Sequence, residues 1–356
     1  DRMMTPPLAP PRTSVADPAL ARPDWTVSDN RDPDLLWLDK NENVDPKLAA
    51  IVRKALSEIS LATQSSYPDA AGLYQKLADH LDLAPENLIL SAGSDGVIRS
   101  VFEAFIDPGS VVLHTQPTFA MYGVYCRMYG ADARAQTYRP SNSGPALTAS
   151  DMVDAIQASS PKLVCLPNPD SPTGTVFSLS EMWTIIEAAD NAGAVMLVDE
   201  AYYPFHAETV LPWVTEFPRL VVTRSTGKAW GLAGFRIGYG AASSEMAAIL
   251  HKVRPMYETN SIAVAVFERM LDHVGDMRDS VKRLEEGKAI ILDAMDELGF
   301  RTLRGQGNFL HVSFGSKAPE IHSALENLVY YRKDFDEPCL QGFSRFSSAT
   351  PEQLAP

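Results

Sequence analysis

The sequence predicts an α/β fold in three layers, with a mostly parallel central sheet between helices and a smaller α+β domain. Two features of the 356-residue chain indicate this fold. Between residues 88 and 223, short and wholly apolar segments alternate with helical segments, which is typical of parallel strands buried on both faces. After about residue 260 a long helical stretch precedes an alternating strand, and this change indicates a second domain. The length also suits about two domains of roughly 150 residues each.

Each expected element depends on a local pattern. A first helix is expected to open at Asp45 and Pro46, because a capping acid followed by proline is typical of a helix N-terminus. The expected strands of the sheet are residues 88–90, 111–113, 163–166, 194–198 and 220–223. The helices between them are expected to begin at Ser94, to cover 121–128, and to follow a capping box of Ser178 and Glu181. The second domain is expected to hold a helix over 263–298, a strand over 309–314 and a helix over 321–325.

Domain boundaries follow from these patterns. Residues 1–34 are expected to form an extended arm, since residues 1–33 contain seven prolines and little periodicity. Residues 61–261 are assigned to the large α/β domain, and residues 35–60 with 262–356 to the small domain. Tyr122, Tyr125 and Tyr129 recur at helical spacing and are interpreted as packing residues.

Composition excludes several classes of protein. The formal net charge is −14, which argues against nucleic acid or an anionic membrane as the main partner. Three cysteines cannot form a disulfide framework, no apolar stretch approaches the roughly 20 residues of a membrane span, and no signal peptide is evident. The seven histidines lack metal-site spacings such as HxxxH. We therefore expect a cytoplasmic protein without a metal ion.

Small and polar residues follow four of the expected strands, at the edge where open parallel sheets bind ligands. The turn 91–96 leads into a helix, where exposed N–H groups suit a phosphate. The loop 167–174 is rigid because it contains several prolines. Asp199 directly follows the strand over 194–198, where a buried carboxylate needs a cation. Lys228 lies in a glycine-rich apolar segment, eight residues before Arg236.

Each of these features also has a plainer explanation. The first turn could serve packing, the second could be a stiff surface turn, and Asp199 could cap a helix in solvent. Lys228 and Arg236 could be ordinary surface cations. Together, however, the four features meet one chemical requirement: a Schiff-base lysine, an acid for a pyridinium nitrogen, a phosphate cradle and a rigid polar loop are what pyridoxal 5′-phosphate (PLP) needs from a protein.

With these motifs in this order, the chain resembles the fold-type I PLP-dependent aminotransferases of class I/II and is most similar to histidinol-phosphate aminotransferases. The resemblance runs from the segment Leu38-Asp39-Lys40-Asn41-Glu42-Asn43 to Glu352. It implies that Lys228 joins the cofactor aldehyde, that Asp199 keeps the pyridine nitrogen protonated and that Tyr202 binds the ring hydroxyl. It also implies transamination between an amino acid or amino-phosphate compound and a 2-oxo acid, in a homodimer with shared active sites.

The resemblance assigns the remaining site residues as well. It implies a phosphate site of Ser94, Asp95, Gly96, Ser225 and Arg236, with the Asp95 side chain turned away from the phosphate. The other residues that it implies are Phe119 stacked on the ring, Ser171 beside the ring hydroxyl, Tyr67 at the phosphate of the neighbouring subunit, Arg345 and Arg332 at the substrate, and Asn43 in the substrate site.

Three positions depart from the family pattern. Ser171 precedes Pro172 where asparagine is usual, Phe119 replaces a ring-stacking tyrosine, and Gly227 stands where a hydroxyl residue often precedes the lysine. Two other functions therefore stay open: a PLP-dependent decarboxylase or lyase on the same fold, and a non-catalytic binding protein.

Overall fold

The computed structural model describes residues 8–355. Its strands are β1 (Leu36–Trp37), β2 (Leu88–Ser91), β3 (Val111–Gln116), β4 (Asp132–Thr137), β5 (Leu163–Pro167), β6 (Val195–Asp199), β7 (Leu220–Ser225), β8 (Gly238–Ala242), β9 (Arg301–Leu303), β10 (Phe309–Ser313), β11 (Val329–Tyr330) and β12 (Ser344–Ser347). Its α-helices are α1 (Thr13–Ala16), α2 (Pro46–Ser57), α3 (Leu61–Ser65), α4 (Ala71–Leu81), α5 (Gly93–Phe105), α6 (Ala120–Met128), α7 (Ala149–Ser159), α8 (Leu179–Asn191), α9 (Ser244–Val253), α10 (Ser261–Met270), α11 (Val274–Glu297), α12 (Ala318–Leu325) and α13 (Pro351–Leu354).

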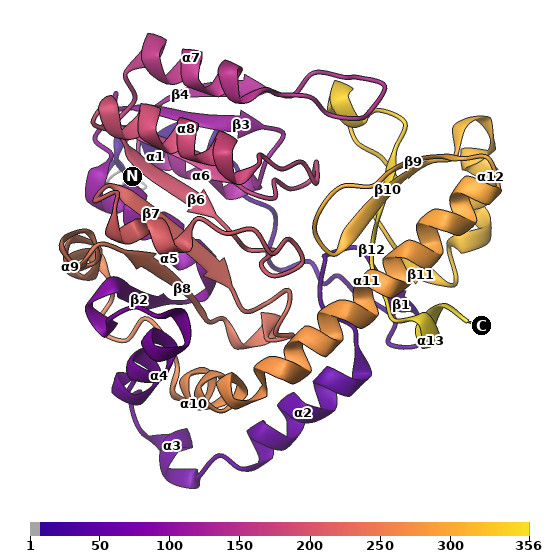
Figure 1. Cartoon of the computed structure of the whole chain (residues 1–356), viewed down its shortest axis with the longest axis horizontal. Helices are drawn as coiled ribbons and strands as arrows, with labels where there is room; N and C mark the ends of the chain where they lie inside the picture. The colour runs from indigo at the N-terminus through magenta and orange to yellow at the C-terminus, as the bar shows by residue number, and fades with distance from the viewer. Residues whose placement is uncertain (1–7, 356) are drawn as a thin grey trace, which may run out of the picture.

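A seven-stranded sheet forms the centre of the molecule (Figure 1), with the strand order β2-β8-β7-β6-β5-β3-β4. The neighbours among β3 to β7 pair in parallel, whereas β8 is antiparallel to both β2 and β7. The prediction of a mostly parallel central sheet is therefore confirmed.

Helices cover both faces of this sheet because its central strands are apolar on both sides. In β6, Met196 and Val198 join one apolar core, which also receives side chains of α4, α7, α8 and α10. Val195 and Leu197 point to the other face and pack with α5, α6 and α9. Figure 1 shows these helices on either side of the sheet. The result is the predicted three-layer arrangement.

A second, smaller set of strands lies beside the large sheet. β10 is central in an antiparallel sheet of order β12-β10-β9, and β1 pairs in parallel with β11. Leu310 and Val312 of β10 enter an apolar core with Phe346, so strand alternation sends Phe309 and His311 to the opposite face. Figure 1 shows α11 extending from α10 to these strands. The face with Phe309 points toward the large sheet. The ring of Phe309 packs edge-on against the ring of Tyr202, which follows β6, with 5.2 Å between the ring centres.

The described part of the arm contacts helix α6. Ser14 Oγ donates to the carbonyl of Met128 at 2.7 Å, and the guanidinium of Arg12 lies 5.6 Å from the ring centre of Tyr129. Residues 1–7 of the expected arm lie outside the described residues. The arm segment that the structure describes is thus packed against the helix that follows β3.

The structure differs from the expected elements in several places, and three of these differences have a clear physical reason. The helix expected over 263–298 is two helices, α10 and α11, separated by a 3-10 turn at Leu271–His273. Apolar spacing continues through this turn, so periodicity does not reveal it. Strands β4 and β8 were not expected: β4 is polar and largely exposed, and β8 consists of Gly-Tyr-Gly-Ala-Ala. Neither segment carries the apolar, β-branched pattern of a strand.

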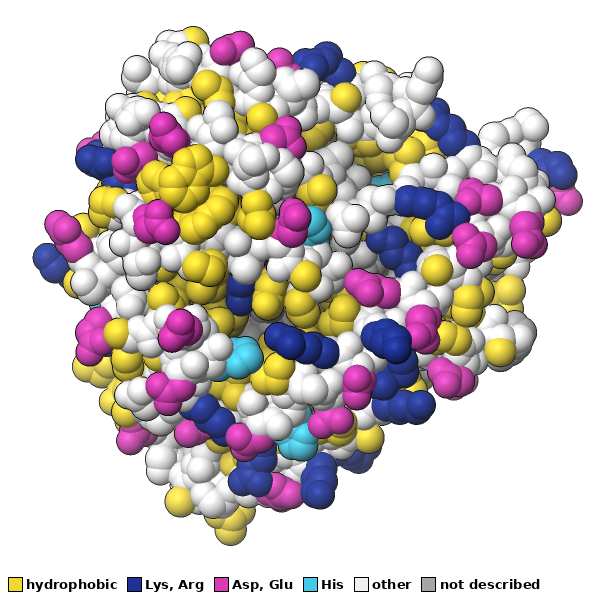
Figure 2. All heavy atoms as spheres, viewed as in Figure 1, with side chains coloured by type: hydrophobic (Ala, Val, Ile, Leu, Met, Phe, Trp, Pro, Cys, Tyr) yellow, Lys and Arg dark blue, Asp and Glu magenta, His cyan; other side chains and the backbone are white. Residues whose placement is uncertain are grey.

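Acidic and basic side chains are interspersed on the face shown in Figure 2. No helix within residues 8–355 combines the length and apolar composition that a membrane span needs.

Candidate active site

The four predicted turns meet at one edge of the large sheet. The parallel strands β3, β5, β6 and β7 all point their carboxyl ends to this edge, and β2 runs in the same direction as β7 because both are antiparallel to β8. The reversed strand β8 places its amino end there and begins at Gly238, two residues after Arg236. Residues far apart in the sequence therefore come together because of strand direction.

The first turn and Arg236 form a cradle for an anion. Helix α5 begins at Gly93, whose φ of +75° suits glycine. A Cβ atom on Gly93 would lie 2.6 Å from Arg236 Nη2, so the guanidinium covers this turn. A Cβ on Gly238 would lie 2.5 Å from the backbone nitrogen of Ser94. Backbone N–H groups at a helix start, next to a guanidinium, provide the charge and donors that a phosphate requires.

Other predicted phosphate residues surround this cradle. Ser225 ends β7, and its Oγ accepts from the N–H of Gly227 at 2.9 Å. Gly96 lies in the first turn of α5, where a Cβ would be 2.8 Å from the Cβ of Ser91. The carboxylate of Asp95 accepts a hydrogen bond from Tyr125 Oη at 2.9 Å. Helix α6 thus holds the one acidic side chain in this turn.

Asp199 is a buried acid whose partners are uncharged. Its Oδ2 accepts from Tyr122 Oη at 3.0 Å, and its Oδ1 accepts from the N–H of Ala201 at 3.0 Å. Burial raises the pKa of Asp199 to about 6, against the lowering effect of these hydrogen bonds. A buried carboxylate in this state gains stability from a cation.

Three polar side chains from distant segments meet beside Asp199. Asn41 Nδ2 donates to Tyr202 Oη at 3.0 Å, and Tyr202 Oη donates to Ser171 Oγ at 3.3 Å. Ser347 Oγ donates to Asn41 Oδ1 at 2.8 Å, which fixes the amide. Hydroxyl and amide groups from four separate segments therefore converge around Tyr202 Oη and Asn41.

Lys228 lies close to this group. Its Nζ donates to the carbonyl of Lys40 at 3.1 Å and is 5.9 Å from the ring centre of Tyr202. The next residue is held by Asn43, whose Nδ2 donates to the carbonyl of Ala229 at 3.2 Å. Asn43, which the resemblance implies in the substrate site, thus holds the backbone beside the lysine, and its Nδ2 also donates to Ser280 Oγ at 3.1 Å.

Arg345 is buried at the side of the small sheet. Its Nη2 donates to the carbonyl of Asp39 at 2.8 Å, whereas its buried Nε has no partner among residues 8–355. Burial lowers the pKa of this guanidinium. Arg345 is opposite His311 in the β10–β12 ladder, and burial lowers the pKa of His311 to about 3, so the imidazole is neutral. An oxyanion would supply the negative charge that the Arg345 guanidinium lacks among its hydrogen-bond partners.

Arg332 forms a backbone bridge with Arg345, but its side chain is exposed and has other neighbours. Its guanidinium lies 3.8 Å from the ring centre of Phe335 and 3.9 Å from Glu337 Oε2. The backbones of Arg332 and Arg345 are therefore paired, but the two guanidinium groups contact different neighbours.

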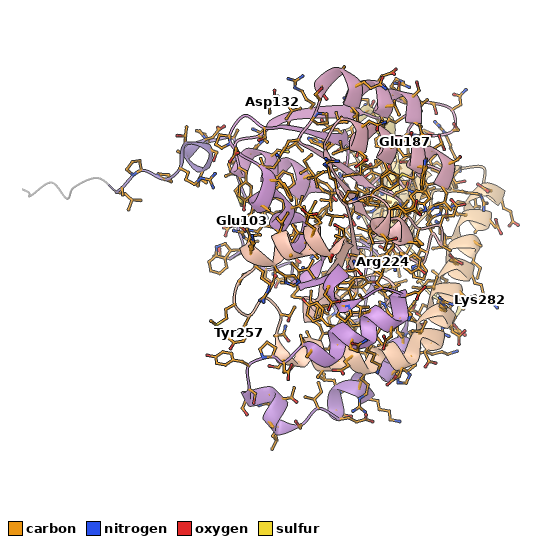
Figure 3. All side chains as sticks on the ribbon, turned by 60° about the vertical axis from the view of Figure 1, so that its left-hand side comes forward. Glu103, Asp132, Glu187, Arg224, Tyr257 and Lys282 are labelled. Carbon is orange, nitrogen blue, oxygen red and sulfur yellow. The ribbon has the colours of Figure 1, made fainter. Side chains whose placement is uncertain are left out.

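The two predicted aromatic residues lie in different places. Phe119 precedes α6, is 39% exposed and packs edge-on against Tyr122 at 6.0 Å. Tyr67 is 77% exposed and stacks on Tyr257 at 4.4 Å. Figure 3 shows Tyr257 projecting outward from its loop. Tyr67 is thus at the surface of its own chain, stacked on another exposed tyrosine.

Four residues of the site were not assigned from the sequence. Asn41 lies in the segment 38–43 that carries the family resemblance, but the resemblance implies a role only for Asn43 in that segment. Tyr122 and Tyr125 were interpreted as packing residues, and this interpretation is incomplete because both also donate to acids. Asp170 is fully buried, and burial raises its pKa to about 7. Helical spacing and a prolyl loop do not indicate such hydrogen bonds.

The comparisons with known proteins agree with this geometry. The family description "Aminotransferase class I and II" matches residues 33–355. The chain belongs to this family. A histidinol-phosphate aminotransferase of Caldanaerobacter subterraneus subsp. tengcongensis is 31% identical to this aminotransferase over 290 residues, which cover 80% of each protein.

Solved structures share the fold of this aminotransferase. The histidinol-phosphate aminotransferase from Sinorhizobium meliloti in complex with PLP has a TM-score of 0.76 at 21% identity, covering 90% of this chain and 87% of that one. The L-threonine-O-3-phosphate decarboxylase from Porphyromonas gingivalis has a TM-score of 0.75 at 20% identity, covering 90% and 96%. The predicted fold-type I architecture is confirmed.

The protein is a PLP-dependent aminotransferase, and its residues fit that cofactor. The buried Asp199 has no charged partner in its hydrogen bonds, which suits a pyridinium. The glycine-rich cradle under Arg236 suits the phosphate. When bound, PLP supplies the electron sink that allows a Cα proton to leave an amino substrate. Within residues 8–355, no three His, Cys, Asp or Glu side chains are grouped as a metal site.

Proposed function

We propose that this aminotransferase moves an amino group between an amino-phosphate compound and a 2-oxo acid, with histidinol phosphate as the amino donor. The names of its relatives support this donor. The observation that carries the proposal is Arg345, a buried guanidinium whose Nε has no partner among the described residues. Its planar fork suits both a phosphate and a carboxylate. One residue can therefore receive the two substrates in turn.

In this proposal each side chain of the candidate active site has a separate role. Lys228 Nζ takes the proton from the substrate Cα as general base. The carboxylate of Asp199 holds the positive charge at the ring nitrogen, and Tyr202 with Ser171 holds the ring oxygen. The turn of Ser94, Asp95 and Gly96 binds the phosphate together with Ser225 and Arg236, and Phe119 packs on the ring. Arg345 orients the substrate, with Arg332 and Asn43 as further substrate-side residues.

We also propose a cytoplasmic homodimer whose active sites are shared between subunits. Its support is an exposed apolar surface formed by the loop before α4, helix α3 and the loop before α10. Leu61 is 82% exposed, Tyr67 77% and Met256 80%, and exposed apolar side chains of this size are typical of an interface. In such a dimer Tyr67 would reach the phosphate of the neighbouring site. The division into an arm, a large domain and a small domain belongs to the same proposal.

The test is an assay of the purified protein with PLP, histidinol phosphate and 2-oxoglutarate. We expect glutamate to form only when both substrates are present. Aspartate and phenylalanine serve as comparison donors at equal concentration, and a higher kcat/KM for either of them would contradict the proposed donor.

Decarboxylation is the second candidate, and the structural likeness to L-threonine-O-3-phosphate decarboxylase favours it. A phosphorylated amino acid keeps a carboxylate that could be released as carbon dioxide. The same incubations are therefore also measured for carbon dioxide with O-phosphothreonine as substrate. Release without glutamate formation would replace the proposed reaction, and absence of any turnover with PLP bound would indicate a binding protein.

A further inference from the structure

Helix α6 places two phenols against the two acids of the candidate cofactor site. Tyr122 Oη donates to Asp199 Oδ2 at 3.0 Å, and one turn later Tyr125 Oη donates to Asp95 Oδ2 at 2.9 Å. Tyr122 is 0% exposed and its ring packs edge-on against Phe119. The two residues lie three positions apart, so they share one face of the helix. This face is directed at the carboxyl edge of the sheet.

The surroundings of Asp199 favour its neutral form, and the hydrogen bond from Tyr122 opposes this effect. The other donor to Asp199 is the N–H of Ala201, and the charges nearby are the like charges of Glu200 and Asp95. Cys165 of β5 and Asp170 of the following loop also face the phenol of Tyr122. Among residues 8–355, Tyr122 is therefore the one side chain that donates a hydrogen bond to Asp199, and this bond stabilises the ionised form of the acid.

We propose that Tyr122 is a positioning residue of this aminotransferase: its phenol keeps Asp199 ionised and oriented toward the pyridine nitrogen of PLP. The proposal rests on the proposed role of Asp199. Tyr122 acts on the cofactor through the acid, because its hydroxyl is bound to Asp199. At the same time its ring supports Phe119, so one side chain fixes both the acid at the ring nitrogen and the aromatic residue proposed to stack on the ring.

The expected effect of Tyr122→Phe can be worked out from the pKa of Asp199. Burial places this pKa at about 6 with the phenol in place. Removing one hydrogen bond to a charged group raises it by roughly one unit or more. At pH 6 the ionised fraction of Asp199 then falls from about one half to about one tenth, so PLP binding weakens roughly fivefold. At pH 8 both proteins keep most of Asp199 ionised, and the difference should be less than about twofold.

The experiment compares the wild type, Tyr122→Phe and Tyr129→Phe. Tyr129 is a matched control because it lies at the end of the same helix and donates to neither acid in the described structure. Apoprotein is titrated with PLP between pH 5.5 and 8.5, and the pyridine nitrogen is followed by NMR with ¹⁵N-labelled PLP. We expect Tyr122→Phe to raise the pH midpoint of PLP affinity by about one unit and to move the ¹⁵N signal toward the unprotonated ring. The second ionisation of the cofactor phosphate also lies near pH 6, but it is common to all three proteins.

An unchanged midpoint and ¹⁵N signal in folded Tyr122→Phe would overturn the proposal, as would an equal shift in Tyr129→Phe. If Asp199→Asn itself leaves the ¹⁵N signal unchanged, the proposed role of Asp199 fails first, which separates the two failures. Should Tyr122→Phe not fold, 3-fluorotyrosine at position 122 keeps the ring and makes the hydroxyl a stronger donor. The midpoint should then move to lower pH, and a midpoint that stays or rises would refute the role of Tyr122.

Discussion

One methyl group added at Gly238 should displace the backbone of the anion cradle. In Gly238→Ala the new Cβ would lie 2.5 Å from the nitrogen of Ser94, 2.6 Å from the carbonyl carbon of Gly93 and 2.9 Å from the oxygen of Arg224. All three atoms belong to the backbone, so no side chain can rotate away. The turn has to retreat by about 0.9 Å to restore an ordinary contact of 3.4 Å. That displacement is enough to lose a hydrogen bond to a phosphate oxygen.

The cost follows from the number of bonds lost. Charge-assisted hydrogen bonds contribute about 1.5–3 kcal/mol each, so loss of one should weaken PLP binding roughly 10- to 150-fold. Overpacking should also lower the free energy of unfolding by about 1–3 kcal/mol. The assay is titration of the apoprotein with PLP, followed by the absorption of the lysine-bound cofactor, with thermal unfolding measured in parallel.

Gly234→Ala is the matched control, since a Cβ there meets no heavy atom within 4 Å. We expect this variant to bind PLP within about twofold of the wild type. A folded Gly238→Ala protein with wild-type affinity for PLP would refute the inference that this turn holds the phosphate.

Three further predictions concern the same site. Lys228→Ala should lose the absorption band of the lysine-bound cofactor and at least about 10³-fold in rate; retained turnover would contradict its role. Arg345→Gln should raise the KM for the 2-oxo acid by roughly 10- to 100-fold while leaving PLP absorption unchanged, whereas Arg345→Lys should recover part of the loss; steady-state kinetics decide this. Because the raised pKa of Asp199 is about 6, its ionised form is lost as pH falls through 6, so PLP affinity should decrease in that direction; an affinity that rises below pH 6 would exclude the assignment.

The strands that could be predicted from the sequence are those that packing makes apolar. β5, β6 and β7 are buried on both faces. Because every side chain of such a strand is buried, its sequence is a continuous apolar run, which is recognisable without the structure. β4 is exposed at the sheet edge, where no packing constrains its side chains. β8 needs small residues because Gly238 and Gly240 lie against Ser94 and Val97. Because the backbone of β8 lies so close to α5, this strand needs glycines in place of the β-branched residues by which a strand is recognised in a sequence.

The candidate site could be predicted where a residue type performs the chemistry and could not where a neighbour supports it. Lysine, aspartate and arginine at the ends of strands indicate cofactor chemistry directly. The amide of Asn41 and the phenol of Tyr122 join the candidate site only through hydrogen bonds across 161 and 77 positions of sequence. Such contacts depend on the tertiary fold. The helical spacing of Tyr122 predicts that it is buried, but it does not predict its hydrogen bond to Asp199.

Two departures from the family pattern are joined by one buried carboxylate. Asp170 Oδ1 accepts from Thr118 Oγ1 at 2.7 Å and from the N–H of Ser171 at 2.9 Å, so it fixes both the residue before Phe119 and the residue that replaces asparagine. Its Oδ2 accepts from two more hydroxyls, at 2.6 and 2.7 Å. Four donors satisfy a carboxylate that has no cation among these bonds. The Thr118 hydroxyl and the Ser171 N–H are therefore held by the same carboxylate. Asp170 thus fixes the backbone at Ser171 and the turn before Phe119, so the two positions that depart from the family pattern are held by one buried side chain.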